Sequence, residues 1–286
     1  MNDTSPHVVF TCNGKELNFS RRTFLMGVLN VTPDSFSDGG KYFSAERAIA
    51  HAEQMIADGA DIIDIGGEST RPNAEEISVD EELRRVIPVI QQLKKQNDVI
   101  ISIDTYKSIV AEQALQNGAS IVNDISGLKF DERMVDVIAN NKATLVAMHI
   151  QGTPKTMQNN PSYNNVVAEV KEELCNSVQK AHAAGIQQII IDPGIGFGKN
   201  LQHNLMLLHH LHEFEELGCP ILVGTSRKRF IGDVLNLPVN ERLEGTAATV
   251  AVAVMNGAKI IRVHDVKEMK RVAVMVDAIQ QCEVPL

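Results

Sequence analysis

Cationic side chains that could hold an anion follow two apolar runs towards the end of the chain. Lys228 stands between Arg227 and Arg229 after the run ILVG, and Arg262 and His264 follow the run AKII. Lysine, arginine and histidine bind phosphate through charge-assisted hydrogen bonds, and backbone N–H groups at a helix start add to such a site. Either neighbouring arginine could instead be a solvated surface residue, and for Arg229 this interpretation is favoured. We therefore expect Lys228, Arg262 and His264 to bind a phosphate or diphosphate.

A second set of polar residues, two carboxylates and a carboxamide, follows three other apolar runs. Asp104 ends IISID, Asn123 lies in ASIVND, and Asp192 ends IIID. Such groups form paired hydrogen bonds with the amino and ring N–H edge of a flat heterocycle. A buried aspartate without a partner is costly, so a donor-rich ligand or a cationic side chain must face these residues. The two sets predict a ligand with phosphate at one side and an amide- or guanidine-like edge at the other.

The stretch 24–40, FLMGVLNVTPDSFSDGG, changes character at Asn30. The residues before Asn30 are apolar and suit a strand buried on both faces, whereas those after it are rich in hydroxyls, carboxylates and glycines. A connection of this length and composition exceeds what joining two elements requires. We expect a functional loop at 30–40, with an ordinary surface connection as the alternative.

These residues must be positioned by a strand–helix unit that repeats along the chain. Five times, a glycine closes an amphipathic stretch and a buried apolar run follows: ADIIDIG, ASIVNDI, IQQIIIDPG, CPILVGT and AKIIRVHD. Glycine takes the left-handed conformation that ends a helix, and Asn97 and Asn141 give weaker versions of the same stop. Helical spacing predicts helices over 45–56, 83–93, 131–140, 162–184, 201–217, 240–255 and 265–281.

Counting the opening strand gives eight strand–helix units, which predict a single (β/α)8 barrel over residues 1–286. Residues 7–19 are expected to form a small hairpin that closes the barrel floor, within an N-terminal segment 1–20. An open doubly wound sheet is the alternative, but no GxGxxG follows the first strand. In a parallel barrel all strand ends meet at one face, where an active site is expected. The polar ends are Asn30, Asp64, Asp104, Asn123, Asp124, His149, Asp192, Thr225 to Arg229 and Arg262 to Asp265.

Composition excludes several classes of protein. A net charge of −9 argues against a nucleic-acid surface, and no apolar run reaches the length of a membrane span. Without a signal pattern at the N-terminus, we expect a cytoplasmic protein. The four cysteines lack metal-type spacing and predict reduced thiols: Cys12, Cys175, Cys219 and Cys282.

Four histidines crowd one predicted helix: His203, His209, His210 and His212. His209 and Glu213 have metal-ligand spacing. The segment nevertheless has the leucine periodicity of an outer helix, so we interpret these histidines as solvated. His149 is structural or near the site.

Eight motifs, in order along the chain, make it resemble the bacterial dihydropteroate synthases. They are GVLNVTPDSFSDGG, DIGGESTRP, SIDTYK, VNDISG, MHIQGTPKTMQ, DPGIGFGK, GTSRKRFIG and IRVHD. The resemblance covers residues 24–275, and no motif is broken. It implies a transferase of folate biosynthesis that makes 7,8-dihydropteroate and pyrophosphate from 6-hydroxymethyl-7,8-dihydropterin diphosphate and 4-aminobenzoate.

The resemblance also implies roles for individual residues. Positions that bind the pterin match Asp104, Asn123, Asp192 and Lys228, and Arg262 matches the residue lying against the pterin ring. Asn30 matches a position tied to Mg²⁺ and the diphosphate, which His264 also contacts. Positions around the substrates and the sulfonamide-sensitive 4-aminobenzoate site match Phe36, Thr70, Arg71, Pro72 and Ser226, and Thr70 is also expected at the pterin diphosphate.

The reaction that this resemblance implies is a substitution at the pterin CH₂ carbon. Mg²⁺, Arg262 and His264 are expected to stabilise the departing diphosphate, and Asp104 to favour a pterin cation in a dissociative, SN1-like path. Lys228 completes the expected catalytic group. Loops 30–40 and 67–78 are expected to close and exclude water. A homodimer and sulfonamide binding are further implications, with Leu208, Leu211, Val272 and Val276 as interface candidates.

Three other functions fit parts of the pattern. A barrel lyase could use Lys228 as a Schiff-base amine, which requires a lowered pKa inside the barrel. A pterin-binding methyltransferase domain would work with a corrinoid partner. A pterin-binding protein without catalysis would share the pocket alone.

Overall fold

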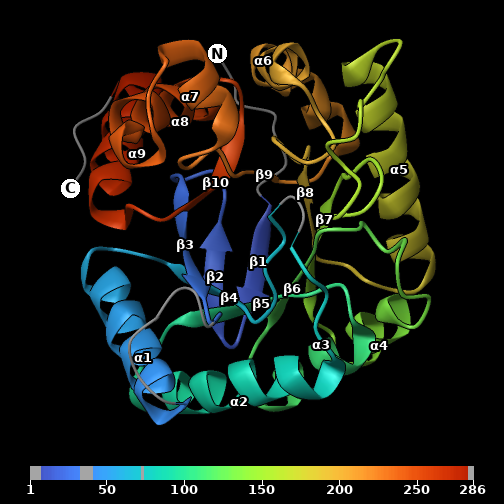
Figure 1. The fold of residues 1–286 in the computed structure, drawn as a ribbon, viewed down its shortest axis with the longest axis vertical. Helices are drawn as coiled ribbons and strands as arrows, with labels where there is room; N and C mark the ends of the chain where they lie inside the picture. The colour runs from blue at the N-terminus through green and yellow to red at the C-terminus, as the bar shows by residue number, and fades with distance from the viewer. Residues whose placement is uncertain (1–7, 33–40, 72–73, 283–286) are drawn as a thin grey trace.

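A closed barrel of eight parallel strands forms the centre of the molecule (Figure 1). The computed structural model describes residues 8–32, 41–71 and 74–282. Neighbouring strands follow the order β10-β3-β4-β5-β6-β7-β8-β9 round the barrel, which confirms the predicted fold class. The strands are β3 (Phe24–Asn30), β4 (Ile62–Gly66), β5 (Ile100–Asp104), β6 (Ile121–Asp124), β7 (Thr144–Met148), β8 (Ile189–Asp192), β9 (Ile221–Val223) and β10 (Ala258–Val263).

Helices connect the strands and cover the outside of the barrel (Figure 1). They are α1 (Lys41–Ala57), α2 (Val79–Gln96), α3 (Ser108–Gln116), α4 (Met134–Asn140), α5 (Val166–Ala183), α6 (Leu201–His209), α7 (Arg229–Leu235), α8 (Leu243–Met255) and α9 (Val266–Gln281). The continuous helix predicted over 201–217 is wrong. His210 leaves helical geometry (φ −101°, ψ 19°), and the chain continues as a 3-10 helix, η2 (Leu211–Leu217). A second 3-10 turn, η3 (Val239–Glu241), precedes α8.

Glycines end the helices where the sequence predicts it. The five glycines that precede buried strands all have positive φ, between 68° and 123°: Gly59, Gly118, Gly185, Gly218 and Gly257. The weaker asparagine stops differ, because Asn97 is extended at φ −131° and Asn141 has φ −89°. Lys142 takes the left-handed conformation after Asn141, at φ 52°.

Side chains of the barrel strands alternate between two surroundings. On β4, Ile63 and Ile65 pack in the core between strands and helices, whereas Ile62 packs in a separate apolar layer inside the barrel. The same layer contains Met26, Ile100, Ile121, Val146, Ile190, Leu222 and Ile260. Because side chains of a strand alternate, residues two positions further along face the barrel interior above this layer. Asp64 and Arg262 are such residues.

An antiparallel hairpin lies against this inner apolar layer. It consists of β1 (Val9–Cys12) and β2 (Lys15–Asn18), which pair from Val9 with Asn18 to Cys12 with Lys15. Phe10 and Leu17 are buried in the same cluster as the residues of the inner apolar layer. Phe19 joins them through edge-to-face contacts with Phe10 and Phe24. The hairpin therefore packs at the N-terminal end of the strands, opposite the polar strand ends.

Among the described helices, none has the length and apolar content needed to cross a membrane. All four cysteines are free thiols, and Cys12 is buried.

Candidate active site

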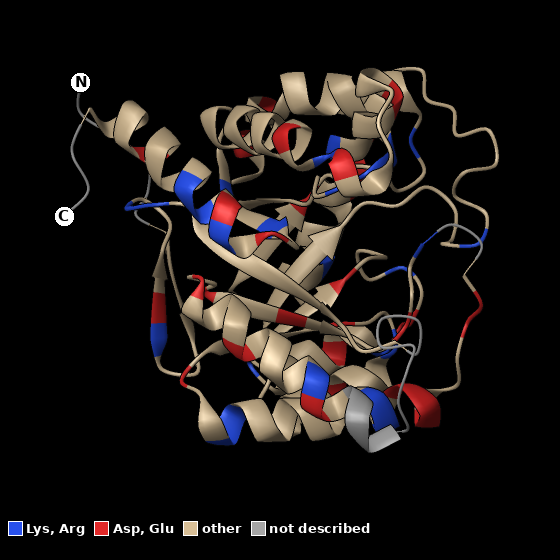
Figure 2. Cartoon of the chain, turned by 60° about the vertical axis from the view of Figure 1, so that its left-hand side comes forward, with Lys and Arg blue, Asp and Glu red and all other residues tan. Residues whose placement is uncertain are grey.

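Arg262 is held by two aspartates inside the barrel. Its Nε donates to Asp64 Oδ2 and its second guanidinium nitrogen donates to Asp104 Oδ2, each at 2.6 Å. Asn123 Nδ2 donates to the same Asp64 oxygen at 3.0 Å. The residues come from β10, β4, β5 and β6, and the register pairs Asp104 with Asn123 across neighbouring strands. Figure 2 shows charged positions of both signs on these central strands. The barrel thus assembles one arginine, two carboxylates and a carboxamide.

This cluster keeps hydrogen-bonding capacity for a ligand. Asp64 has no exposed surface. Within the described residues, Asp64 Oδ1 and Asp104 Oδ1 have no hydrogen-bond partner. Burial raises the pKa of Asp104 to about 7, against the opposing charge of Arg262, and the nearby charge of Asp64 raises it further. Burial lowers the pKa of Arg262, but Asp64 and Asp104 outweigh it and raise that pKa. Each aspartate therefore keeps one buried oxygen without a protein partner among the residues described, beside a permanently charged guanidinium.

Asp192 and Lys228 lie on the neighbouring part of the barrel mouth. Burial raises the pKa of Asp192, opposed by Lys228, and Asp192 Oδ1 accepts a hydrogen bond from Gly194 N at 2.7 Å. Lys228 Nζ donates to the carbonyl oxygen of Ile195 and lies 4.5 Å from the centre of the Phe197 ring. Burial lowers the pKa of Lys228 to about 8, while the charge of Asp192 raises it. The loop after β8 therefore holds the lysine, whose charge and that of Asp192 act on each other.

His264 is a buried, neutral imidazole whose ring contacts Ser226. The hydroxyl of Ser226 lies 3.0 Å from His264 Nδ1 and accepts from His264 N at 3.2 Å. Burial lowers the pKa of His264 to about 4, and the charges of Arg262 and Arg227 lower it further. With the Ser226 proton donated to Nδ1, Nε2 carries the ring proton and can donate to an anion.

The two arginines that flank Lys228 have different surroundings. Arg227 Nε donates to Asp265 Oδ2 at 2.9 Å, so its charge is already paired. The Arg229 side chain is 87% exposed and lies 3.5 Å from Asp233. The interpretation of Arg229 as a surface residue is confirmed.

Asn30 ends β3 beside Gly66 of β4, and two polar side chains border this glycine. A Cβ atom at Gly66 would lie 3.7 Å from both Asn30 Oδ1 and Asp104 Oδ2. Thr70 is half-buried and Arg71 exposed in the loop that follows β4. The charge of Arg71 contributes to the lowered pKa of His264, so this loop lies near the barrel mouth. Phe36 and Pro72 lie outside the described residues.

Asp64 is the residue that sequence reasoning missed. It was recognised as a polar strand end but given no role, yet it accepts hydrogen bonds from both Arg262 and Asn123. The signal was present, because IIDIG and IISID place an aspartate on the same inward alternation.

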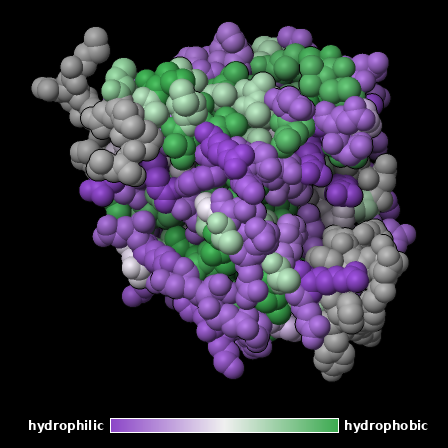
Figure 3. Space-filling view, turned by 90° about the vertical axis from the view of Figure 1, so that its left-hand side faces the viewer, coloured by the Kyte–Doolittle hydropathy of each residue, from purple (hydrophilic) through white to green (hydrophobic). Residues whose placement is uncertain are grey.

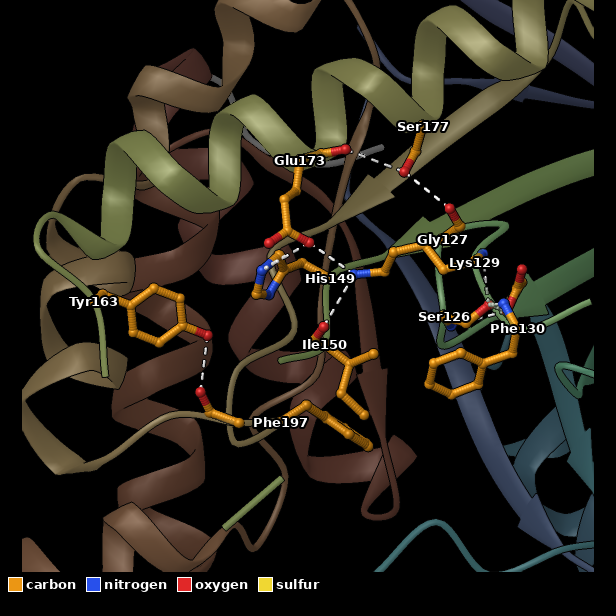
Figure 4. A network of polar contacts seen from close by, with 12 residues as sticks. Ser126, Gly127, Lys129, Phe130, His149, Ile150, Tyr163, Glu173, Ser177 and Phe197 are labelled. Carbon is orange, nitrogen blue, oxygen red and sulfur yellow. Dashed lines mark hydrogen bonds and ion pairs between the residues drawn. The ribbon is translucent and has the colours of Figure 1, made fainter. Parts of the chain in front are cut away.

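His149 belongs to a polar network beside the site. Its Nε2 lies 3.5 Å from Glu173 of α5, whose carboxylate also accepts from Lys129 at 2.7 Å (Figure 4). On the other side of the ring, Nδ1 lies 2.8 Å from Lys199 Nζ, which donates to the carbonyl oxygen of Phe197 at 2.9 Å. Burial lowers the pKa of His149 to about 4, and the nearby Lys199 lowers it further. The network fixes the loop that carries Phe197 beside Lys228.

The histidine-rich segment has no metal-binding geometry in the described part of the chain. No group of three or more potential ligands is present there. His203 completes a capping box with Asn200, and His210 pairs with Glu213 at 2.9 Å. The expected interface role of Leu208, Leu211 and Val276 is wrong, because all three are buried. Val272 packs against the same core.

Comparison with known proteins extends this geometry. Residues 26–264 match the family model described as "Pterin binding enzyme". A dihydropteroate synthase of Bacillus subtilis is 52% identical over 92% of this chain and 90% of its own length. The chain belongs to the dihydropteroate synthase family. These proteins are transferases, and this chain is an enzyme of that class.

Two solved dihydropteroate synthases share the fold at high similarity. The Yersinia pestis protein in complex with a sulfonamide drug superposes with a TM-score of 0.90 and 43% identity, covering 96% of this chain and all of that one. The Xanthomonas albilineans protein with 4-aminobenzoic acid gives a TM-score of 0.90 and 42% identity, covering 99% and 100% of the two chains. Because these relatives are dihydropteroate synthases at 42% identity or more, they argue against the alternative of a pterin-binding methyltransferase domain. The lowered pKa that a Schiff-base lyase requires is present at Lys228, but family membership argues against that reaction.

Proposed function

We propose that this chain condenses 6-hydroxymethyl-7,8-dihydropterin diphosphate with 4-aminobenzoate to give 7,8-dihydropteroate and pyrophosphate. The observation that carries the proposal is the pairing of Arg262 with Asp64 and Asp104, with Asn123 on the same carboxylate. This group offers unpartnered acceptor oxygens at the depth where a flat, donor-rich ring would lie. The Bacillus subtilis relative, 52% identical to this chain, is a dihydropteroate synthase.

The pterin ring is assigned to the inner part of the site. Its amino and ring N–H groups match the acceptors of Asp104, Asn123 and Asp192, and Lys228 donates to its oxygen. Arg262 is fixed by its two aspartates, so its guanidinium plane can stack against the ring without losing further side-chain entropy. Pre-formed orientation of this kind lowers the cost of reaching the transition state.

The diphosphate is assigned to the outer part of the mouth, where His264 donates through Nε2 and Arg262 supplies positive charge. A Mg²⁺ ion fits at Asn30, since magnesium takes few protein oxygens and completes its shell with phosphate and water. The oxygens of Asn30 and Asp104 that border Gly66 are consistent with such a place. When bound, the ion would neutralise charge on the leaving diphosphate.

The reaction is a substitution at the CH₂ carbon. The C–O bond breaks, its electron pair leaves with the diphosphate, and the electron-rich ring shares the resulting positive charge. The ionised carboxylate of Asp104 stabilises that cation through space. The lone pair of the 4-aminobenzoate amine then forms the C–N bond, and the amine loses a proton to solvent or to the departing diphosphate. Thr70, Arg71 and Ser226 are assigned to the 4-aminobenzoate and outer substrate positions, which a sulfonamide would share.

The decisive experiment measures pyrophosphate release by the purified chain. We expect release that requires both the pterin diphosphate and 4-aminobenzoate, that falls when Mg²⁺ is chelated, and that is inhibited by a sulfonamide competitively with 4-aminobenzoate. Release in the absence of 4-aminobenzoate would indicate hydrolysis instead. Borohydride trapping of Lys228 with substrate would support the lyase alternative. A cytoplasmic location stays a prediction from the sequence.

We also propose a homodimer formed through α7, α8 and α9. Apolar side chains gather over these helices in the upper part of Figure 3. The exposed members on these helices and on the turn η3, which supplies Val239, are Val234, Leu235, Val239, Leu243, Val252, Met255, Val274, Met275 and Ile279. A contiguous apolar surface of this extent is typical of a protein interface. The face lies on the outside of the barrel, so each protomer would keep its own site.

A further inference from the structure

A half-buried lysine with no part in the proposed chemistry contacts both ends of the loop between β4 and α2. Lys107 follows Asp104 by three residues, in the connection from β5 to α3. Its Nζ donates to Glu68 Oε2 at 2.5 Å, to the carbonyl oxygen of Ile77 at 2.7 Å and to Glu82 Oε2 at 2.8 Å. One ammonium group therefore contacts the beginning of the loop, its end and helix α2.

Glu68 completes the same arrangement from the loop side. Its carboxylate accepts from the Tyr106 hydroxyl at 2.5 Å and from Ile77 N at 3.2 Å. Arg85 on α2 also donates to the carbonyl oxygen of Gly67 at 2.8 Å. The two ends of the loop are thus tied to each other and to the residues that directly follow Asp104.

The ion-pair group is buried and carries two negative charges for one positive charge. The exposed fraction of the side chain is 1% for Glu82, 7% for Glu68 and 11% for Lys107. Burial raises the pKa of Glu82, against Lys107; burial lowers the pKa of Lys107, but the two glutamates outweigh it and raise that pKa. Buried ion pairs seldom add more stability than apolar side chains of similar size, whereas they do fix geometry. A positioning role accounts for the group better than stability does.

The part of the loop between these anchored ends carries Thr70 and Arg71. The hydrogen bonds within its described residues are local: Ser69 Oγ accepts from Arg71 N at 3.5 Å, and Ala74 N donates to the Arg71 carbonyl oxygen at 3.1 Å. Within the described residues, Glu68 and Ile77 are the loop positions that bond to Lys107, on either side of this segment.

We propose that Lys107 is a positioning residue that places Thr70 and Arg71 over the 4-aminobenzoate side of the site. Lys107 bonds to both Glu68 and Ile77 and follows Asp104 closely in the chain. It therefore ties the position of the loop to β5, the strand that carries Asp104. This inference rests on the proposed function, because it assigns 4-aminobenzoate to the loop.

The kinetic test compares Lys107→Met with Lys95→Met, a control on the exposed face of α2. We expect Lys107→Met to raise the KM for 4-aminobenzoate at least about 10-fold, since small displacements of positioning groups cost up to about 100-fold. The KM for the pterin diphosphate should rise several-fold less, because the residues assigned to the pterin ring stay in place and only Thr70 of the displaced loop is expected at the diphosphate. Lys107→Arg, which keeps the charge, should recover part of the loss. An unchanged 4-aminobenzoate KM, or an equal rise in both constants, would overturn the assignment.

Removing Lys107 leaves the carboxylates of Glu68 and Glu82 without their cation, a loss that can prevent folding. The triple variant Lys107→Met, Glu68→Gln, Glu82→Gln removes that burden and should show the same selective rise in KM. Amide hydrogen exchange supplies a readout that is independent of activity. Ile77 N should exchange faster in Lys107→Met than in Lys95→Met. Equal protection in the two variants would contradict the anchoring of the loop ends by Lys107. Absence of pyrophosphate release by the unaltered chain would refute only the proposed function. The hydrogen-exchange result would still test whether Lys107 anchors the loop ends.

Discussion

Replacing Asp64 by asparagine should move the acid limb of the pH–rate profile to lower pH. Asp64 and Asp104 share the guanidinium of Arg262, and the charge of Asp64 is one of the causes that raise the pKa of Asp104. Asparagine has nearly the same shape and keeps an acceptor for Arg262 and Asn123, but it removes the charge. Asp104 then loses a like-charged neighbour and gains a larger share of the Arg262 charge.

Both changes lower the pKa of Asp104, and their size can be bounded. Its pKa is about 7 in the unaltered chain, and removing a like charge at a shared site lowers a carboxyl pKa by about 1 to 3 units. The proposed role of Asp104 needs its ionised form. Activity of the unaltered chain should therefore fall as the pH drops below about 7, and activity of Asp64→Asn should hold to a pH between about 4 and 6. The exchange of a charged for a neutral hydrogen bond should also cost about 1 kcal/mol of unfolding free energy.

The measurement is kcat/KM for the pterin diphosphate from about pH 4 to 9, because this parameter reports groups of the free enzyme. Asp136→Asn, on the exposed surface of α4, is the matched control. It makes the same exchange away from the site, so its pH–rate profile should equal that of the unaltered chain. Urea unfolding at pH 7.5 confirms that the variant is folded. An acid limb that stays at the same pH in Asp64→Asn, or moves upward, would refute the electrostatic coupling.

Three further predictions follow from the same contacts. Lys228→Ala and Asp192→Ala should each lower activity by at least about 100-fold with unfolding midpoints in urea little changed, and near-normal turnover would remove the assignment. Because the folded-state pKa of His149 is about 4, below its unfolded value, the unfolded chain binds more protons between pH 6.5 and 4. Stability should therefore fall as pH drops through that window, by up to about 3 kcal/mol, and less steeply in His149→Gln. Val252→Asp with Met275→Lys should shift sedimentation from dimer to monomer, whereas a monomeric unaltered chain would refute the proposed interface.

Much of the fold could be read from local patterns. The five glycine stops were predictable because only glycine takes positive φ at little cost, and each marks where a helix ends before a strand. The inward alternation of the strands was also visible, since it depends only on the period of two. Asn97 and Asn141 do mark helix ends, but neither takes the expected left-handed conformation. The long helix over 201–217 was wrong because helix ends depend on tertiary contacts that override weak local preferences.

The candidate site divides in the same way. The strand ends that carry Asp104, Asn123, Asp192 and Arg262 were predicted individually, because polar residues after buried runs are a local signal. The interface residues were misjudged, since Leu208 and Leu211 have helical periodicity that fits a core face as well as an outer one. Only the packed structure shows that the exposed apolar surface lies on α7, α8 and α9.

The sequence by itself determined the chemical inventory of the barrel mouth and the side of each strand on which it stands. The tertiary structure decided which groups became partners. Asp64 and Arg262 are 198 residues apart in the chain and meet only because β10 closes against β3, beside β4. Lys107 and the two ends of its loop meet for a similar reason. A local pattern fixes the direction of a side chain, but barrel closure and register fix its distance from another.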